Sequence, residues 1–158
     1  MTDLYDDGSL ASLEGSIDSW LAAFRATSGS AMAAVDRAEP GDVPGDEPRW
    51  YVRMRGEEKD FTTVWLTLGQ RTLRYETYVM PAPEENAALL YEHLLRRNER
   101  LVGAHFSIGI EDAVFLRGEL PLGAVTADEL DRAIGTLYAT VEQVFGGLLR
   151  IGFAGRFP

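Results

Sequence analysis

The chain offers few side chains of the kinds that catalyse reactions or bind metals. It contains no cysteine and only two histidines, at positions 93 and 105. Without cysteine there are no disulfides, thiolate nucleophiles or Cys-ligated metal sites. His93 and His105 share neither the His-Glu-x-x-His nor the His-x-His spacing that brings two zinc ligands together. We therefore expect both histidines at a surface or an interface, and we predict no catalytic residue, no metal and no cofactor.

Motifs for nucleophiles, nucleotides and calcium are absent from the sequence as well. It has no Gly-x-Ser-x-Gly elbow, no phosphate-binding loop, no dinucleotide fingerprint and no EF-hand ladder of ligands. The glycine-rich run 146–152 closes a predicted helix, whereas phosphate-binding loops open one. Glu111 and Asp112 are typical of a turn. The sequence thus predicts that the protein is not an enzyme.

Aromatic and arginine side chains share one face of the predicted strands. From Trp50 onward the pattern repeats every two residues, which sends successive side chains to opposite faces of a sheet. One face is apolar. The other carries aromatic residues and arginines, the types that dominate the energetics of protein interfaces. We predict that this second face binds a protein or peptide partner through Tyr51, Arg53, Trp65, Arg74, Tyr78, Phe115 and Arg117.

Two other roles for this face stay open. Cross-strand pairs of aromatic residues and threonines stabilise any half-exposed sheet, whether or not it binds a partner. A sheet with aromatic residues and arginines can also stack bases, as RNA-recognition modules do. The sequence contains no motif of such a module, and its acidic balance argues against nucleic acid.

Length and charge define the class of protein. With 158 residues, of which 46% are apolar, we expect a single globular domain over residues 1–158. The formal net charge is −10, and residues 1–48 hold ten acids against two arginines. Such a chain repels phosphate backbones, so we predict no nucleic acid and no membrane partner. The acidic start differs from a secretory signal, and no apolar run approaches the roughly 20 residues of a membrane span, so we expect a cytoplasmic protein.

The first half of the chain predicts one helix and three strands. Apolar residues recur at helical spacing over residues 10–27. Residues 36–48 form an acidic Pro/Gly loop, because its prolines and glycines interrupt helices and strands alike. Strands follow at about residues 50–55, 61–68 and 71–79. A register that keeps the apolar residues on one face pairs Val52 with Val64 and Trp50 with Leu66 in the first hairpin. A turn at Gly69-Gln70 in the second hairpin pairs Leu66 with Leu73.

The second half predicts a helix, two strands and a final helix. The first of these helices begins near Glu84 and has an unusually wide apolar band. Two strands follow it, with a three-residue loop that pairs Ile108 with Leu116. The last helix starts with a capping box in which Thr126 and Glu129 satisfy each other's backbone amides. The sheet and its helices thus occupy residues 49–150, with a flexible tail at 152–158. We predict a homodimer through the wide apolar band, whose residues are Leu90, Tyr91, Leu94 and Leu95.

The resulting order is helix, three strands, helix, two strands, helix. It predicts a two-layer α+β fold with a five-stranded antiparallel sheet and helices on one face. This layout resembles the type III secretion chaperone-like fold and, more closely, the YbjN family of bacterial sensory transduction regulators. The stretches that carry the resemblance are Trp50-Tyr51-Val52-Arg53-Met54, Val64-Trp65-Leu66, Tyr75-Glu76-Thr77-Tyr78-Val79-Met80-Pro81 and the helix over residues 86–98.

The resemblance implies a non-enzymatic, often dimeric domain that binds proteins, and it supplies no catalytic residues. The leading hypothesis is therefore a chaperone-like or regulatory domain that acts through protein–protein contacts. A small-ligand sensor with a pocket between the helices and the sheet is an alternative, which a cluster of buried charges would favour. A scaffolding subunit of a larger assembly is a second alternative.

Overall fold

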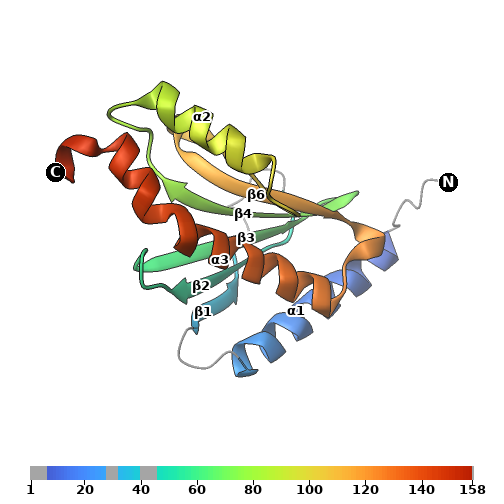
Figure 1. Cartoon of the computed structure of the whole chain (residues 1–158). Coiled ribbons are helices and arrows are strands. Elements are labelled where there is room, and N and C mark those ends of the chain that lie inside the picture. The colour runs from blue at the N-terminus through green and yellow to red at the C-terminus, as the bar shows by residue number, and fades with distance from the viewer. Residues whose placement is uncertain (1–6, 28–31, 40–45, 158) are drawn as a thin grey trace.

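The computed structural model describes residues 7–27, 32–39 and 46–157, which form a helical layer on one antiparallel sheet (Figure 1). The helices and strands are α1 (Asp7–Thr27), β1 (Met32–Arg37), β2 (Arg49–Arg55), β3 (Phe61–Leu68), β4 (Thr72–Met80), α2 (Ala87–Asn98), β5 (His105–Ile108), β6 (Val114–Pro121) and α3 (Ala127–Gly152). Short 3-10 helices are η2 (Ile110–Asp112), η3 (Leu122–Ala124) and η4 (Ala154–Arg156). The α+β class and the antiparallel sheet confirm the sequence prediction.

The sheet has six strands in the order β1-β2-β3-β4-β6-β5, and every neighbouring pair is antiparallel. The prediction of five strands is wrong because β1 lies in an alanine-rich stretch without clear alternation. Pairing with β2, in which Val35 lies opposite Val52, defines this strand, and local sequence does not reveal such a tertiary contact. Asp36 and Arg37, placed in the predicted loop 36–48, end β1. Residues 40–45 of that loop lie outside the described residues.

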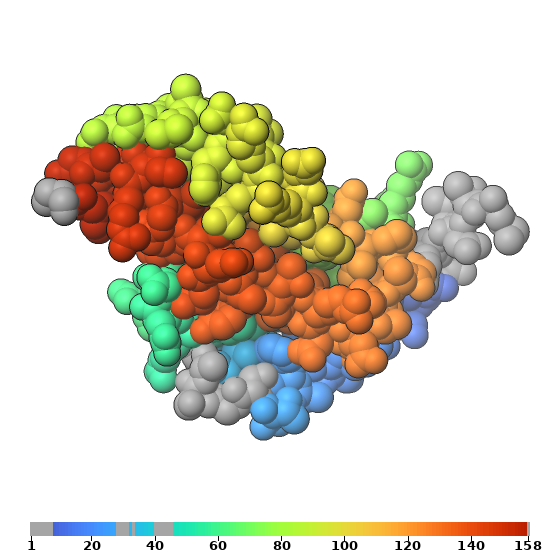
Figure 2. All heavy atoms as spheres, viewed as in Figure 1, coloured from blue at the N-terminus to red at the C-terminus, as the bar shows by residue number. Residues whose placement is uncertain are grey.

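The hydrophobic core lies between the sheet and its helices. Alternate residues of the central strands point into it, and Val52, Val64 and Leu66 are fully buried. Helix α3 packs on β3, β4 and β6, while α1 packs on β1 and α2 on β5. Figure 1 shows α3 crossing the sheet, and Figure 2, from the same side, shows the three helices covering much of this face. Among the described helices, none is long and apolar enough to cross a membrane.

The first two hairpins show how far alternation fixes register. Between β2 and β3 the predicted pairs are confirmed, including Trp50 opposite Leu66. Between β3 and β4, Leu66 pairs with Tyr75 instead of Leu73. The Gly69 N–H donates to the Thr72 carbonyl at 3.0 Å, so the turn lies one residue later than predicted. Both registers keep the apolar residues on one face, and alternation therefore does not distinguish them.

The predicted pairing of Ile108 with Leu116 is wrong, because Leu116 pairs with Phe106. The connection is five residues long, 109–113, and a hydrogen bond of 2.8 Å joins the amide of its first residue to the carbonyl of its last. Its two acidic residues both have a φ of 58°, a turn conformation that alternation does not signal. As a result Ile108 is 51% exposed and Ile110 is 76% exposed, although the sequence places both on the apolar side.

Helix α3 begins and ends with specific contacts. The Thr126 hydroxyl accepts a hydrogen bond from the Glu129 amide at 3.1 Å, the capping contact expected from the sequence. At the other end the helix continues to Gly152, and Phe153 beyond it is buried. The Gly155 N–H then donates to the Glu85 carboxylate at 2.8 Å. Of the flexible tail predicted at 152–158, Gly152 thus ends α3 and Phe153 is buried, while Pro158 lies outside the described residues. The flexibility of this tail stays a prediction.

Candidate functional site

Opposite the helices, the sheet presents a second surface, called here the bare face. The register of the strands places all seven predicted partner-binding residues on it. Arg49, Phe61 and Glu76 lie on it too, although the sequence did not predict these three as partner-binding residues. Arg49 has the same alternation as Tyr51 but precedes the predicted start of the strand. The bare face is thus made of Arg49, Tyr51, Arg53, Phe61, Trp65, Arg74, Glu76, Tyr78, Phe115 and Arg117.

The aromatic residues of the bare face form two cross-strand pairs. The rings of Tyr51 and Trp65 lie 5.4 Å apart at 54°, and those of Tyr78 and Phe115 lie 5.6 Å apart at 89°. The second pair is edge-to-face and the first is tilted, and such geometries suit the charge distribution of aromatic rings. Tyr78 is 42% exposed, and the other three are partly buried. These rings therefore leave apolar surface open to solvent while holding fixed positions.

Three arginines of the bare face stack on its aromatic rings. The guanidinium carbons of Arg49, Arg53 and Arg117 lie 4.1, 4.1 and 4.4 Å from the ring centres of Trp65, Phe61 and Phe115, respectively. Stacking attracts the cation to the ring and leaves the N–H groups at the rim of the guanidinium free to donate. The arrangement therefore restrains long side chains that would otherwise lose rotamer freedom on binding a partner.

Glu76 is the central anion of the bare face. Its carboxylate accepts from Arg117 Nε at 2.7 Å and lies 3.5 Å from Arg49 Nη2. Arg74 donates instead to Glu47 at 2.8 Å. Burial lowers the pKa of Arg49, while the nearby Glu76 carboxylate opposes this shift and the Arg74 cation adds to it. The Arg49 Nε is buried without a hydrogen-bond partner, so this arginine keeps an unused donor beneath the surface.

A second region, the α2–β5 groove, contains the predicted dimer residues. It is an apolar hollow of about 250 Å³, lined by Tyr91, Leu94, Leu95, Asn98, Phe106, Ser107 and Ile108. Leu90 and Leu94 are buried in the core, whereas Leu95 is 69% exposed. Only Tyr91 and Leu95 of the four predicted residues thus combine a place in the groove with accessible surface. Ile108 enters the groove from β5, a contribution that the sequence did not indicate.

Asn98 closes the outer edge of β5. Its side-chain amide donates to the Phe106 carbonyl at 3.1 Å and accepts from the Phe106 N–H at 2.7 Å. These two bonds are the ones that a neighbouring strand would make with Phe106. The side chain therefore blocks strand addition at the centre of this edge.

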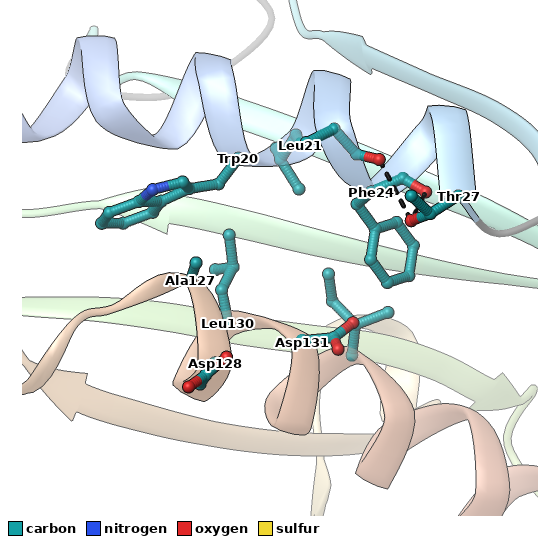
Figure 3. A pocket seen from close by; sticks show the side chains of 10 residues that line it. Trp20, Leu21, Phe24, Thr27, Ala127, Asp128, Leu130 and Asp131 are labelled. Atoms are coloured by element: carbon teal, nitrogen blue, oxygen red, sulfur yellow. Dashed lines mark hydrogen bonds between the residues drawn. The ribbon is translucent and has the colours of Figure 1, made fainter.

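A third region is the α1–α3 groove, an open hollow of about 200 Å³ (Figure 3). Trp20 and Phe24 from α1 line one side of it, and Leu130 and Asp131 from α3 line the other. In the described part of the chain, the buried polar residues are four threonines. The structure therefore offers no cluster of buried charges between helices and sheet in the residues it describes.

The two histidines lie apart from any acidic cluster. His93 accepts a hydrogen bond from Arg97 Nε at 3.0 Å. His105 is exposed on β5, opposite Arg117 of β6. Over residues 7–27, 32–39 and 46–157, no group of three or more histidines and carboxylates is placed to hold a metal ion.

The fold defines the class of protein. The chain is similar to a chain of the heterodimeric ExoU-SpcU complex from the type III secretion system of Pseudomonas aeruginosa, with a TM-score of 0.53 and 16% identity over 82% of this chain and 95% of that one. It is also similar to a chain of the ExsC-ExsE complex, with a TM-score of 0.58 and 18% identity over 86% and 96%. At these identities the likeness shows a shared fold, the type III secretion chaperone-like fold predicted from the sequence.

The family follows from the sequence match. The model of the YbjN family, described as "Putative bacterial sensory transduction regulator", matches residues 33–150. The chain belongs to the YbjN family.

Curated relatives occur in mycobacteria. A protein of Mycobacterium tuberculosis (strain ATCC 25618 / H37Rv) is 37% identical over 114 residues, which cover 72% of this chain. A protein of Mycobacterium leprae is 33% identical over 116 residues, or 73% of this chain. The chain spans 61% and 63% of the lengths of these two relatives.

Proposed function

We propose that the chain is a non-catalytic, chaperone-like or regulatory domain that binds a partner protein through its bare face. The observation that carries this proposal is the set of partly exposed rings and stacked arginines on a sheet face that none of the described helices covers. Aromatic residues and arginine are enriched among the hot spots of protein interfaces. The two similar solved structures described above are complexes between proteins, which also supports a protein partner. The cytoplasmic location stays a prediction.

The proposal is tested by capture of a partner with matched double variants. The chain is used as bait in lysate of its native host, the retained protein is identified by mass spectrometry, and its affinity is then measured with purified components. Trp65→Ala with Arg74→Ala removes a ring and a cation from the bare face. The control, Trp20→Ala with Arg132→Ala, makes the same changes on the helical side, where the Arg132 side chain is 74% exposed.

Loss of a hot spot weakens binding by about 2 kcal/mol or more, which is about thirtyfold in affinity. We expect that loss for the bare-face variant and little change for the control, with far-UV circular dichroism unchanged in both. Equal affinity of the wild type and the bare-face variant would place the partner site elsewhere. The α1–α3 groove would then be the next candidate.

The same proposal includes a homodimer through the α2–β5 groove. Exposed Leu95 and Ile108 give this groove an apolar rim that a second copy would cover. Asn98 occupies the strand edge, so the two copies would meet through side chains and not through a continuous sheet. Sedimentation at micromolar concentration should give about twice the chain mass of 17.5 kDa.

Leu95→Glu should shift this dimer to the monomer, because it would bury a charge in an apolar contact. Leu89→Glu is the matched control, since Leu89 is 55% exposed on the same helix but does not line the groove. A wild-type protein that sediments as a monomer would remove the dimer from the proposal.

A cluster of buried charges in a pocket would favour the sensor alternative, and the described residues form no such cluster between helices and sheet. A scaffolding subunit would also bind a protein through the bare face, so the same experiment tests this alternative.

A further inference from the structure

We infer that the bare face receives an acidic, extended segment of the partner, in which carboxylate side chains are mixed with apolar ones. This inference rests on the proposed function and adds the chemistry of the partner. It follows from the charge of the bare face, from its unused donors and from the way its side chains are held.

The charge of the strands on this side differs from that of the whole chain. Five strand arginines lie on this side of the sheet, namely the four of the bare face and Arg55. The strands carry three carboxylates on the same side, and Glu47 is a fourth because it pairs with Arg74. The formal net charge of the whole chain is −10, so the rest of the protein carries the negative excess. These strand residues are the arginines Arg49, Arg53, Arg55, Arg74 and Arg117 and the acids Asp36, Glu76 and Glu119.

The arginines have more N–H donors than the nearby carboxylates accept. Glu76 forms ion pairs with two arginines, and Arg74 forms one with Glu47. Within the described part of the chain, Arg53 and Arg55 form no ion pair with a carboxylate. An arginine has five N–H donors in a planar fork that matches the two oxygens of a carboxylate. The unused donors therefore favour a partner that is rich in carboxylates.

The aromatic rings specify the remaining part of the partner. Register places Arg117, Glu76, Trp65 and Tyr51 in one row across β6, β4, β3 and β2. The row thus holds a cation and an anion on β6 and β4 and two rings on β3 and β2, on strands about 4.8 Å apart. A segment that carries both acidic and apolar side chains can contact the arginines and the rings together. Beside this row, a hollow of about 360 Å³ lined by Arg74, His105 and Glu119, among others, offers room for a side chain.

A short acidic segment suits this surface better than a nucleic acid does. Screening limits the field of exposed charges to about 8 Å at physiological salt, so a peptide on the bare face is influenced mainly by the nearby arginines. A long polyphosphate chain would extend past this face to the acidic remainder of the protein, which repels it.

The probes are three acetylated decapeptides in which valine alternates with glutamate, glutamine or lysine, together with a ten-nucleotide oligothymidylate. Binding to the full chain is followed by the NMR shifts of backbone amides and of arginine Nε–H groups. We expect the glutamate peptide to bind most tightly and to shift signals of β2, β3, β4 and β6. Its affinity should fall between about 50 and about 300 mM salt, since exposed charges are screened.

Paired variants localise the effect. Arg53→Gln with Arg74→Gln should weaken the glutamate peptide about tenfold, because both cations are exposed on the bare face. Arg96→Gln with Arg132→Gln removes the same charge from exposed arginines of α2 and α3 and should change the affinity less than twofold. Circular dichroism checks that both variants are folded.

The inference is overturned if the glutamate peptide leaves the bare-face signals unchanged, or if the lysine peptide or the oligonucleotide binds there as tightly. It is also overturned if the two double variants weaken binding equally. The captured partner distinguishes failure of this inference from failure of the proposed function. If the partner loses affinity for the Trp65→Ala, Arg74→Ala variant, the proposed function holds. If that partner contacts the face through a segment without excess acidic residues, only the acidic chemistry is contradicted.

Discussion

Trp65 and Leu66 are neighbours on β3, yet their side chains lie on opposite faces of the sheet in different surroundings. Leu66 is fully buried beneath the helices. Trp65 is partly exposed, packs against Tyr51 and carries the guanidinium of Arg49 on its ring. The covered face is thus built from interlocking apolar side chains, and the bare face from pairs and stacks whose groups still reach solvent.

This difference separates stability from recognition. Burial of apolar area on the covered face supplies most of the folding free energy, and a void there costs both transfer energy and packing. On the bare face, the same strands hold arginines and rings in place without using all their donors or area. Substitutions on the two faces should therefore affect different measurements, and the following experiments test that separation.

The largest expected effect is on the covered face. Leu66→Ala should lower the free energy of unfolding by about 2–5 kcal/mol, because it leaves a cavity in a closely packed core. Chemical denaturation with urea measures this loss. The adjacent change, Trp65→Ala, removes one aromatic pair and one cation–ring contact at a partly exposed site and should cost only about 1–2 kcal/mol.

The two changes together test the separation of roles. Leu66→Ala should leave affinity for the partner nearly unchanged under conditions in which the variant is fully folded, whereas Trp65→Ala should weaken it. If Trp65→Ala destabilised the fold as much as Leu66→Ala, the main role of the bare face would be structural. Its cross-strand pairs would then stabilise the sheet without binding a partner.

The next effect concerns the loop between β2 and β3, where the two faces meet. The Glu142 carboxylate of α3 accepts from the amides of Glu57 and Glu58 at 2.9 and 3.0 Å. Glu142→Ala should cost about 1–2 kcal/mol and speed hydrogen exchange of these amides, because both donors lose a charged acceptor. Glu142→Gln keeps one acceptor oxygen and should lose less. Unchanged exchange in the alanine variant would mean that α3 does not anchor this loop.

The contrast between the two faces was predictable from sequence because it depends on alternation. Trp50, Val52, Val64 and Leu66 alternate with polar and aromatic residues, so the buried side of β2 and β3 and their pairing followed directly. A shift of two residues between paired strands preserves the same faces. For this reason alternation did not fix the register after Leu68 or after Ile108, where turn geometry decides it.

Contacts between residues far apart in sequence were not predictable in this way. β1 depends on its pairing with β2, and the exposure of Leu95 and Ile108 depends on how α2 and β5 lie together. Glu76 looked like one more polar strand residue, because only the sheet brings Arg117 and Arg49 to its carboxylate. The sequence thus predicted which face carries the candidate site, but not how its charges are paired.

A smaller effect is expected at the edge of the sheet. Asn98→Ala removes two hydrogen bonds from Phe106 and should cost about 1 kcal/mol or slightly more, since water reaches part of the freed edge. It also opens β5 to pairing with another chain, so the variant should associate beyond the wild-type state as concentration rises. Analytical ultracentrifugation measures this association. Asn98→Asp keeps the acceptor for the Phe106 N–H and should show less destabilisation than the alanine variant.

The smallest effect is a pH dependence at the boundary between the faces. Lys59 donates to the carbonyls of Tyr78 and Val79 at 2.7 and 3.1 Å, and its Nζ lies 5.2 Å from the Tyr78 ring and 5.5 Å from the Phe145 ring. Burial lowers the pKa of Lys59 to about 8. In the unfolded chain a lysine has a pKa of about 10.4.

Between these two pKa values the unfolded chain holds more protons than the folded one, so the free energy of unfolding rises with pH as Lys59 loses its proton. Below the folded pKa the full cost of burying the cation is present. Urea unfolding at about pH 7 and about pH 9 should therefore show a smaller increase for Lys59→Met than for the wild type. The pH range in which this measurement reports on Lys59 ends below about pH 10. Burial raises the pKa of Tyr75 and Tyr78 in the folded chain, so the free energy of unfolding falls with pH once the unfolded tyrosines ionise. Equal slopes for the two proteins would show that Lys59 keeps an ordinary pKa and that water reaches this boundary as freely as it reaches the bare face.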